Sequence, residues 1–398
     1  MRQLNPFNAT KKIRESYVRY LRTLYPISDP DLRKQFEEIL SKEEEFVKGP
    51  YLEVTPPYRL GKPLRELIKE GLLSPLFEEL DSEELPLDRP LYKHQEEAIR
   101  KIVRGRNLIV ATGTGSGKTE AFLIPILHHL LEERYRGTLC PGVRALLLYP
   151  MNALANDQLK RLRSLLRRCE VITFGRYTGE TLQTKREAEE DFRKNFRGEP
   201  RIPNELLSRE EMQASPPHIL LTNYAMLEYL LLRPKDSVFF DGEFARCWKF
   251  LVLDEVHTYD GAKGIETAML IRRLKDRIMR SERGRLQCIG TSATLGGGRT
   301  DFPQVTRFAE QRFDELFEWD EPDDSRQDVV EASRVSQDEY PQPWGAPQTE
   351  FYLEVREILN SNPTSLNAVA ATARKCGVPE EVISLAEKAS DSAQHFLF

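Results

Sequence analysis

A glycine-rich segment near residue 115 has the residue types and spacing needed to hold phosphate groups. Its glycines let the backbone curl until its N–H groups point at phosphate oxygens, and its lysine neutralises their charge. The threonine after the lysine has a hydroxyl that would ligate Mg²⁺. The sequence therefore predicts a binding loop for Mg²⁺ and ATP, made of Thr112, Gly113, Thr114, Gly115, Ser116, Gly117, Lys118 and Thr119.

Two consecutive carboxylates supply the second half of this chemistry. An apolar run over 250–253 is followed directly by Asp254 and Glu255, with His257 two residues further on. A strand delivers the residues at its carboxyl end to the ligand crevice of an open α/β sheet. We expect Asp254 to hold Mg²⁺, through water, and Glu255 to position or deprotonate the attacking water, with His257 in the same catalytic set. Taken alone, the four residues 254–257 fit a surface turn as well.

The elements around these residues predict an α/β fold with a central, mostly parallel sheet. Short apolar runs alternate with amphipathic segments from about residue 91 to 295, a pattern typical of parallel strands covered by helices on both faces. The phosphate loop lies between one such strand and a helix predicted over 119–131, which is the order that a phosphate loop requires. The predicted strands are 107–110, 145–149, 171–174, 219–222, 250–253 and 288–290.

Composition divides the rest of the chain. Residues 1–90 are predicted to be a helical accessory region, with helical spacing at 13–24 and 64–80 and turns marked by proline. The sheet pattern stops past Leu295, where residues 299–349 are acidic and rich in proline and predict a solvated linker. Residues 350–398 are predicted to form short helices, and the charged stretch 184–198 an exposed helix or insertion. The α/β domain that contains the phosphate loop is predicted to span 91–298.

The bulk composition is that of a globular chain. Its 398 residues suffice for two or three domains, with 40% hydrophobic and 30% charged residues. The formal net charge of -5 argues against a surface coated with basic residues but allows a local basic groove. Five widely spaced cysteines indicate neither a zinc site nor a disulfide framework, so we expect reduced, buried thiols. Without a signal sequence or a long apolar run, we expect a cytoplasmic protein with no membrane partner.

Together with Thr291-Ser292-Ala293-Thr294, the phosphate loop and the segment 254–257 resemble the motifs of superfamily 2 helicases. The sequence is similar to the first RecA-like lobe of a DEAD/DEAH-type helicase, and more closely to the large bacterial helicases related to MrfA and Lhr. The shared phrases run from Leu91 to Gln95, from Tyr149 to Leu154 and from Asp254 to Tyr259. This resemblance implies a RecA-like P-loop NTPase domain that uses ATP to move along nucleic acid, with DNA favoured over RNA, in DNA repair or phage defence.

The resemblance also implies roles for single residues. Gln95 would read the adenine edge, because a carboxamide both donates and accepts hydrogen bonds, and Tyr92 would stack nearby. The alternative for Gln95 is an ordinary exposed helix residue. Loops at the strand ends would hold a single strand of nucleic acid by its phosphates, although each loop taken alone fits plain loop chemistry equally well. These contacts would come from Pro150, Met151, Asn152, Arg176, Thr178, Gly179, Thr222 and Asn223.

Ser292, Ala293 and Thr294 would couple the nucleotide state to lobe movement, through hydrogen bonds to Asp254 or His257. The alternative for these hydroxyls is a simple helix cap. Basic residues between 160 and 168 would extend the phosphate track or form a solvated helix face.

A helicase motor has two RecA-like lobes, and the second supplies arginines that stabilise the transition state. Residues 295–398 contain no Q-x-x-G-R-x-x-R motif of such a lobe. We therefore expect the second lobe to be lost by truncation or supplied in trans, and this chain alone to hydrolyse ATP slowly. The alternative is a module that binds nucleotide or nucleic acid within a larger assembly. A P-loop kinase is disfavoured by Gln95 and by the residues 291–294.

Overall fold

The computed structural model describes residues 6–41, 56–113, 115–195, 201–279, 286–295, 298–336, 339, 349–361 and 366–389. Two compact units divide the chain. One unit comprises Pro57–Arg334, and the other comprises Met1–Pro56 together with Val335–Phe398.

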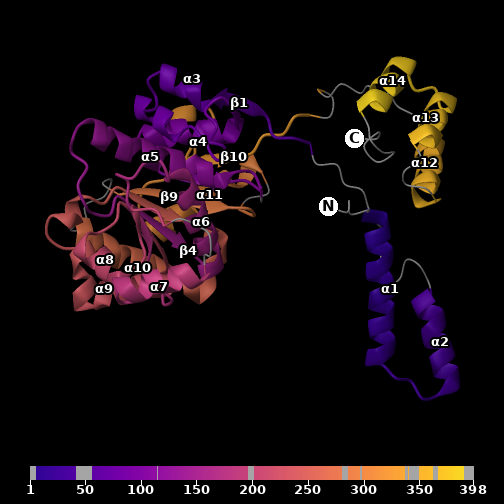
Figure 1. Ribbon diagram of the computed structural model, residues 1–398, viewed down its shortest axis with the longest axis horizontal. Coiled ribbons are helices and arrows are strands. Elements are labelled where there is room, and N and C mark those ends of the chain that lie inside the picture. The colour runs from indigo at the N-terminus through magenta and orange to yellow at the C-terminus, as the bar shows by residue number, and fades with distance from the viewer. Residues whose placement is uncertain are drawn as a thin grey trace. The chain divides into compact units, whose positions relative to one another are not determined.

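The unit Pro57–Arg334 is built on one eight-stranded sheet in which every neighbouring pair of strands is parallel. Figure 1 labels β4, β9 and β10 of this sheet. The strand order is β10-β3-β9-β8-β4-β7-β5-β6. A short antiparallel pair, β1 Leu60–Pro63 and β2 Pro90–Tyr92, lies outside this sheet. The strands of the large sheet are β3 Leu108–Ala111, β4 Ala145–Tyr149, β5 Phe174–Arg176, β6 Glu205–Leu206, β7 Ile219–Asn223, β8 Phe250–Leu253, β9 Gln287–Ser292 and β10 Val329–Glu331.

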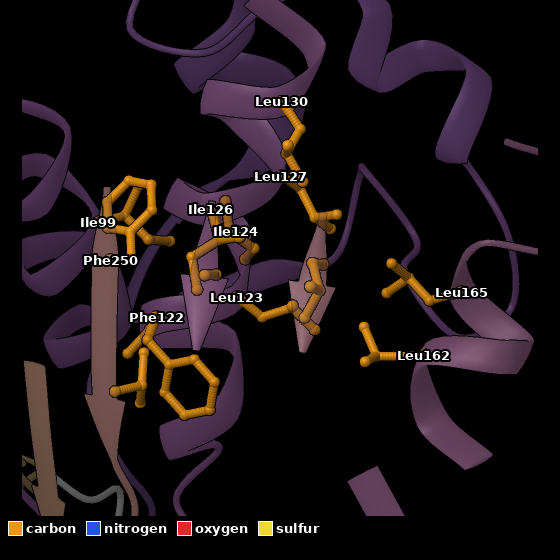
Figure 2. Packing of buried hydrophobic residues seen from close by; sticks show 14 of the residues in the cluster. Ile99, Phe122, Leu123, Ile124, Ile126, Leu127, Leu130, Leu162, Leu165 and Phe250 are labelled. Atoms are coloured by element: carbon orange, nitrogen blue, oxygen red, sulfur yellow. The ribbon is translucent and has the colours of Figure 1, made fainter. Parts of the chain in front are cut away.

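Helices cover both faces of this sheet, because parallel strands are joined by crossover connections. Leu147 of β4 belongs to the apolar cluster under α4, α5 and α6, whereas Leu146 and Leu148 belong to the cluster under α9, α10 and α11. Figure 2 shows Leu127 and Leu162 from α5 and α6 in the first cluster. The helices of this unit are α3 Leu64–Lys69, α4 Lys93–Val103, α5 Lys118–Tyr135, α6 Asn152–Leu165, α7 Lys185–Asn195, α8 Arg209–Ala214, α9 Tyr224–Leu232, α10 Gly261–Met279 and α11 Phe302–Phe313.

The other unit is helical where it is described. Helix α1 Pro6–Leu24 is tied to α2 Pro30–Ser41 by an ion pair between Arg22 and Glu37. Helices α12 Thr349–Ser361, α13 Leu366–Lys375 and α14 Glu380–Ala389 share a small apolar cluster of their own. Across the described residues, none of the helices is long and apolar enough to cross a membrane.

The predicted α/β class with a mostly parallel sheet is confirmed, and so is the exposed helix in the charged stretch, which is α7. The strand predicted over 171–174 instead begins at Phe174. The prediction that the sheet ends near Leu295 is wrong. Strand β10 adds to the sheet beside β3, and α11 packs in the core of the same unit.

The predicted solvated linker 299–349 fails over its first part for an electrostatic reason. Arg106 is bonded to Asp328 at 2.8 and 2.7 Å and to Glu318 at 3.0 Å. Acidic residues that suggest a solvated tail are thus ion-pair partners that fix β10 next to β3. The proline-rich end of the predicted linker, 340–348, lies outside the described residues.

Candidate nucleotide and nucleic-acid site

The polar residues predicted to act together lie where the parallel strands end. The phosphate loop follows β3, Asp254 and Glu255 follow β8, and Ser292 closes β9. These three strands are neighbours in the order β3-β9-β8, so their carboxyl ends meet at one edge. The amide of Thr112 donates to the carbonyl of Ser292 at 2.9 Å, which joins the loop to β9.

The phosphate loop has the backbone conformation that its glycines allow. Gly115 and Gly117 have φ angles of 74° and 72°, in the left-handed region where other residues are strained. The hydroxyls of Thr112 and Ser116 are both buried and hydrogen-bonded at 2.6 Å, so they brace the loop from inside. The backbone of Gly113 lies in the described loop, whereas Thr114 lies outside the described residues.

Side chains at the start of α4 form hydrogen bonds with backbone carbonyls of the phosphate loop. Gln95 donates to the carbonyl of Gly117 at 3.0 Å and accepts from the amide of Tyr92 at 2.8 Å. His94 donates to the carbonyl of Ser116 at 2.8 Å. Both amide atoms of Gln95 therefore already have partners in the protein, and its predicted contact with adenine stays a prediction.

An aromatic group lies beside this support. The ring of Tyr92 stacks on His94 with centroids 5.6 Å apart, and the ring of Tyr58 meets Tyr92 edge-on at 5.1 Å. The Tyr58 hydroxyl would lie 3.5 Å from a Cβ on Gly113, so it borders the phosphate loop. Tyr58 is not among the residues predicted from the sequence, because it precedes the domain start expected at residue 91. His94 could have been found within the phrase 91–95.

The carboxylates meet the phosphate loop directly. Lys118 donates to Glu255 at 2.9 Å, although 137 residues separate them. The hydroxyl of Thr291 donates to Asp254 and accepts from the amide of Glu255 at 3.2 Å. Burial raises the pKa of the Asp254 carboxyl, and the hydrogen bond from Thr291 opposes that shift. Thr291 therefore holds the Asp254 carboxyl in place, a contact that the sequence motif alone did not predict.

Of the residues predicted to couple the nucleotide state to lobe movement, Ser292 is hydrogen-bonded to the nucleotide site. His257 and the Ser292 hydroxyl are hydrogen-bonded at 2.9 Å, one of the pairings that the resemblance implied. Glu255 has a φ of 49°, a left-handed conformation that turns the chain sharply after β8. The backbone amide of Thr294 donates to the Ser292 hydroxyl at 3.2 Å. Ala293 lies half-buried between them.

Helix α6 connects the phosphate loop to the neighbouring strand-end loop. Gln158 donates to the hydroxyl of Thr119 at 3.2 Å, and Arg161 pairs with Glu120. Because Asn152 and Gln158 are on the same helix, the two parts of the site share one rigid element. Arg163, which was considered for a phosphate track, is instead buried against Glu205, with bonds of 2.7 and 2.8 Å.

The residues predicted to hold nucleic acid lie at the ends of β4, β5 and β7, but they differ in exposure. Asn152 accepts from Asn223 at 2.7 Å and donates to Glu180 at 3.1 Å. Arg176 donates to the same Glu180 at 2.9 Å. These polar groups form one hydrogen-bonded cluster at the carboxyl edge of the sheet.

Two other residues of that predicted set point inward. The side chain of Thr222 is buried and donates to the Tyr177 carbonyl at 2.6 Å, and Thr178 is fully buried as well. Their hydroxyls therefore do not reach the surface. Met151 and Gly179 are exposed and Pro150 is half-buried, so the loop tips around them are accessible.

An all-parallel sheet with a glycine loop after β3, a lysine at its end and a carboxylate pair after β8 defines a P-loop nucleoside triphosphatase of the RecA-like class. Residues 92–301 match the DEAD/DEAH box helicase family. The chain belongs to that family, as the sequence motifs predicted.

Named relatives agree with this assignment. The Druantia protein DruE of Escherichia coli (strain UMEA 4076-1) is 34% identical over 73% of this chain and 20% of its own length. The uncharacterized ATP-dependent helicase YprA of Bacillus subtilis (strain 168) is 29% identical over 69% of this chain and 31% of its own. A crystal structure of the DUF1998 helicase MrfA bound to DNA has the same fold, with a TM-score of 0.50 and 19% identity over 84% of this chain and 45% of that chain.

The chain thus spans less than half the length of each of these three relatives. What those longer proteins do as a whole applies to this chain only as a proposal.

Proposed function

We propose that this chain is the first motor lobe of an ATP-dependent nucleic-acid helicase or translocase, which binds and hydrolyses Mg·ATP at the edge formed by β3, β8 and β9. The observation that carries the proposal is the contact of Lys118 with Glu255. It joins the phosphate loop to the carboxylate pair across the sheet. A chance glycine turn or a surface turn would have no reason to make that contact.

The residues present fit a bound Mg·ATP. Gly115 has open space around it, since a Cβ there would meet no atom within 4 Å, and this space can take phosphate oxygens. The hydroxyls of Tyr149 and Tyr259 are buried near Asp254 with no hydrogen-bond partner among the described residues, which suits a bound water network. Thr119 and Asp254 would hold Mg²⁺, which supplies positive charge to the β and γ phosphates.

Lys118 and Glu255 have different roles in ATP hydrolysis. Lys118 exchanges its bond with Glu255 for the phosphate oxygens, which frees the Glu255 carboxylate. That carboxylate orients a water toward the γ phosphorus and accepts its proton as the oxygen–phosphorus bond forms. The bond from the γ phosphorus to the bridging oxygen breaks, and its electron pair leaves with ADP. The hydrogen bond between His257 and Ser292 couples the conversion of ATP to ADP to the end of β9.

We propose that the accessible loops at the ends of β4, β5 and β7 hold a single strand of nucleic acid. Supporting groups are the amides of Asn152 and Asn223 and the guanidinium of Arg176, which suit phosphates rather than bases. DNA is favoured over RNA through the resemblance to MrfA and Lhr. A second RecA-like lobe, in trans or on a longer chain, would supply the arginines for the transition state.

The functional division of the chain is part of the same proposal. The ATP-binding lobe extends from Tyr58, beside the phosphate loop, through β10, rather than over 91–298. The helical segments on either side are accessory. We propose a role in DNA repair on the resemblance alone, and a cytoplasmic location on the absence of a long apolar run from the sequence.

The test is ATP binding and turnover of the purified chain, with and without single-stranded DNA and RNA of one sequence. We expect Lys118→Ala to weaken ATP binding at least tenfold and Glu255→Gln to keep binding but lower turnover at least tenfold. Lys62→Ala, which removes an exposed lysine, is the matched control. Turnover that is unchanged in both variants would refute the proposal that this site hydrolyses ATP. Binding without turnover in the parent chain would favour a binding module.

A further inference from the structure

Two of the cysteines meet at the edge of the sheet opposite to the nucleotide site. Cys140 precedes β4 and Cys247 precedes β8, and these two parallel strands are neighbours. The turns at their amino ends therefore lie side by side, although 107 positions separate the cysteines. Cys140 is exposed and Cys247 is partly exposed, whereas Cys169 and Cys288 are buried. The expectation of buried thiols holds only for the latter pair.

The contacts place both thiols against one short loop. A Cβ on Gly142 would lie 2.8 Å from the Cys247 sulfur, so only glycine leaves room for that thiol there. The same Gly142 has a φ of 137°, which also favours glycine. A guanidinium nitrogen of Arg144 would lie 3.1 Å from the same Cβ, and the other donates to the Cys140 sulfur. The loop around Gly142 and Arg144 therefore brings the two thiols to one place.

A buried arginine holds this arrangement. Arg144 donates to the Cys140 sulfur at 3.3 Å and to the carbonyls of Cys140 and Gly142 at 2.6 and 2.9 Å. It is itself bonded to Glu133 at 2.9 Å, which fixes its position. The guanidinium thus puts a positive charge and a hydrogen-bond donor against the more exposed of the two sulfurs. Such surroundings are typical of reactive rather than inert cysteines.

We propose that Cys140 and Cys247 are a redox modification site, at which hydrogen peroxide or a related hydroperoxide forms a reversible disulfide. The exposed Cys140 sulfur, as the thiolate, attacks a peroxide oxygen, the O–O bond breaks, and hydroxide leaves. The Cys247 sulfur then attacks the resulting sulfenic acid, the S–S bond forms, and water leaves with the Cys247 proton. Each disulfide consumes one peroxide, and a dithiol reductant restores the two thiols.

A different account is that both thiols merely fill space next to Arg144. The two accounts differ in what oxidation does. A disulfide between turns that precede β4 and β8 would close a loop of more than 100 residues and stabilise the fold. It would leave the nucleotide site, at the carboxyl ends of the same strands, unchanged. The inference therefore does not depend on the proposed ATP hydrolysis.

The test uses the full chain, reduced and then titrated with hydrogen peroxide. Alkylation and intact mass count the free thiols, and peptide mapping without reductant locates any disulfide. We expect the loss of two alkylation sites, a Cys140–Cys247 peptide, reversal by dithiothreitol, and a rise of several degrees in thermal midpoint. Cys140→Ser and Cys247→Ser should each abolish the linked peptide and that rise, whereas Cys376→Ser should change neither.

The proposal fails if both thiols stay free at peroxide levels that oxidise a free cysteine peptide. It also fails if oxidation stops at sulfinic acid on Cys140, or if the linked peptides join other cysteines. Either serine variant that folds suffices to decide, so a defect in one of them leaves the test intact.

Discussion

At the scale of single residues, Gly117 combines two demands that the other loop glycines do not share. It has a left-handed φ of 72°, and the Gln95 amide occupies the space where a side chain would start. Gly115 has nearly the same φ, 74°, but open space around it. The two positions therefore separate backbone strain from steric overlap.

We predict that Gly117→Ala destabilises the fold more than Gly115→Ala does. Gly115→Ala should cost about 1 kcal/mol, from the left-handed backbone alone. Gly117→Ala should cost about 1–3 kcal/mol more, because overpacking adds to that strain. Urea unfolding of both variants without nucleotide measures the difference. Adding Gln95→Ala to Gly117→Ala should recover most of the extra loss; equal stability of the two single variants would contradict the prediction.

The residue-level site was only partly predictable. The order and spacing of the phosphate loop and of Asp254-Glu255 indicated that they act together, since strand ends converge in a parallel sheet. Burial was not predictable. Thr222 is buried and satisfied by the Tyr177 carbonyl, because a pairing across 45 residues depends on how the sheet closes. Tyr58 was missed for the same reason: its place beside Gly113 comes from tertiary packing, not from spacing.

At the scale of elements, His218, which directly precedes β7, links the turns that precede β4 and β5. Its ring accepts from the Thr173 amide at 2.9 Å and donates to the Cys140 carbonyl at 3.1 Å. Burial lowers the pKa of His218 to about 4, and the nearby Arg144 acts in the same direction. The ring is therefore held neutral at a junction of the chain.

We predict that this junction makes the fold acid-sensitive. Since the folded pKa is about 4 against the ordinary 6.5, the unfolded chain binds more protons between these values. Stability is then present above pH 6.5 and is lost as the pH falls toward 4. The expected loss from this group is about 2 kcal/mol between pH 7 and pH 5. Urea unfolding of the parent and of His218→Gln at both pH values isolates it; an unchanged pH dependence in the variant would sink the idea.

Elements with a strong apolar run were predictable and short ones were not. Strands β4 and β8 appear where their runs indicated, because a strand buried on both faces must be apolar throughout. Strand β10 has three residues next to acidic neighbours, and its partner Arg106 is more than 200 residues away. Local composition therefore indicated a linker at a place where the ion pair between Arg106 and Asp328 holds β10 beside β3.

At the scale of the whole molecule, the compact unit ends at Arg334 rather than at residue 298. Helix α11 and strand β10 bury Phe313, Val305 and Val329 in the core that also holds Ile109 of β3. Removing α11 and β10 would expose one edge of β3, the strand that leads into the phosphate loop.

We predict that residues 57–334 form a stable fragment and that residues 57–298 do not. Loss of a single buried phenylalanine typically costs about 3–5 kcal/mol, and the shorter fragment loses several core residues and an edge strand. Thermal unfolding followed by circular dichroism, with size-exclusion chromatography, compares the two. Equal cooperativity and midpoint for both fragments would show that α11 and β10 are dispensable.

The place of β3 in the sheet also has a consequence for the order of events on the ribosome. Its two neighbours are β9 and β10, which are synthesised about 180 and 220 residues after it. A nascent chain therefore has the phosphate-loop strand long before it has either strand that can pair with it. Because a domain of this kind folds through long-range pairings, the loop stays unformed until translation has passed both of them. During that interval an exposed apolar strand would be the natural substrate for a chaperone.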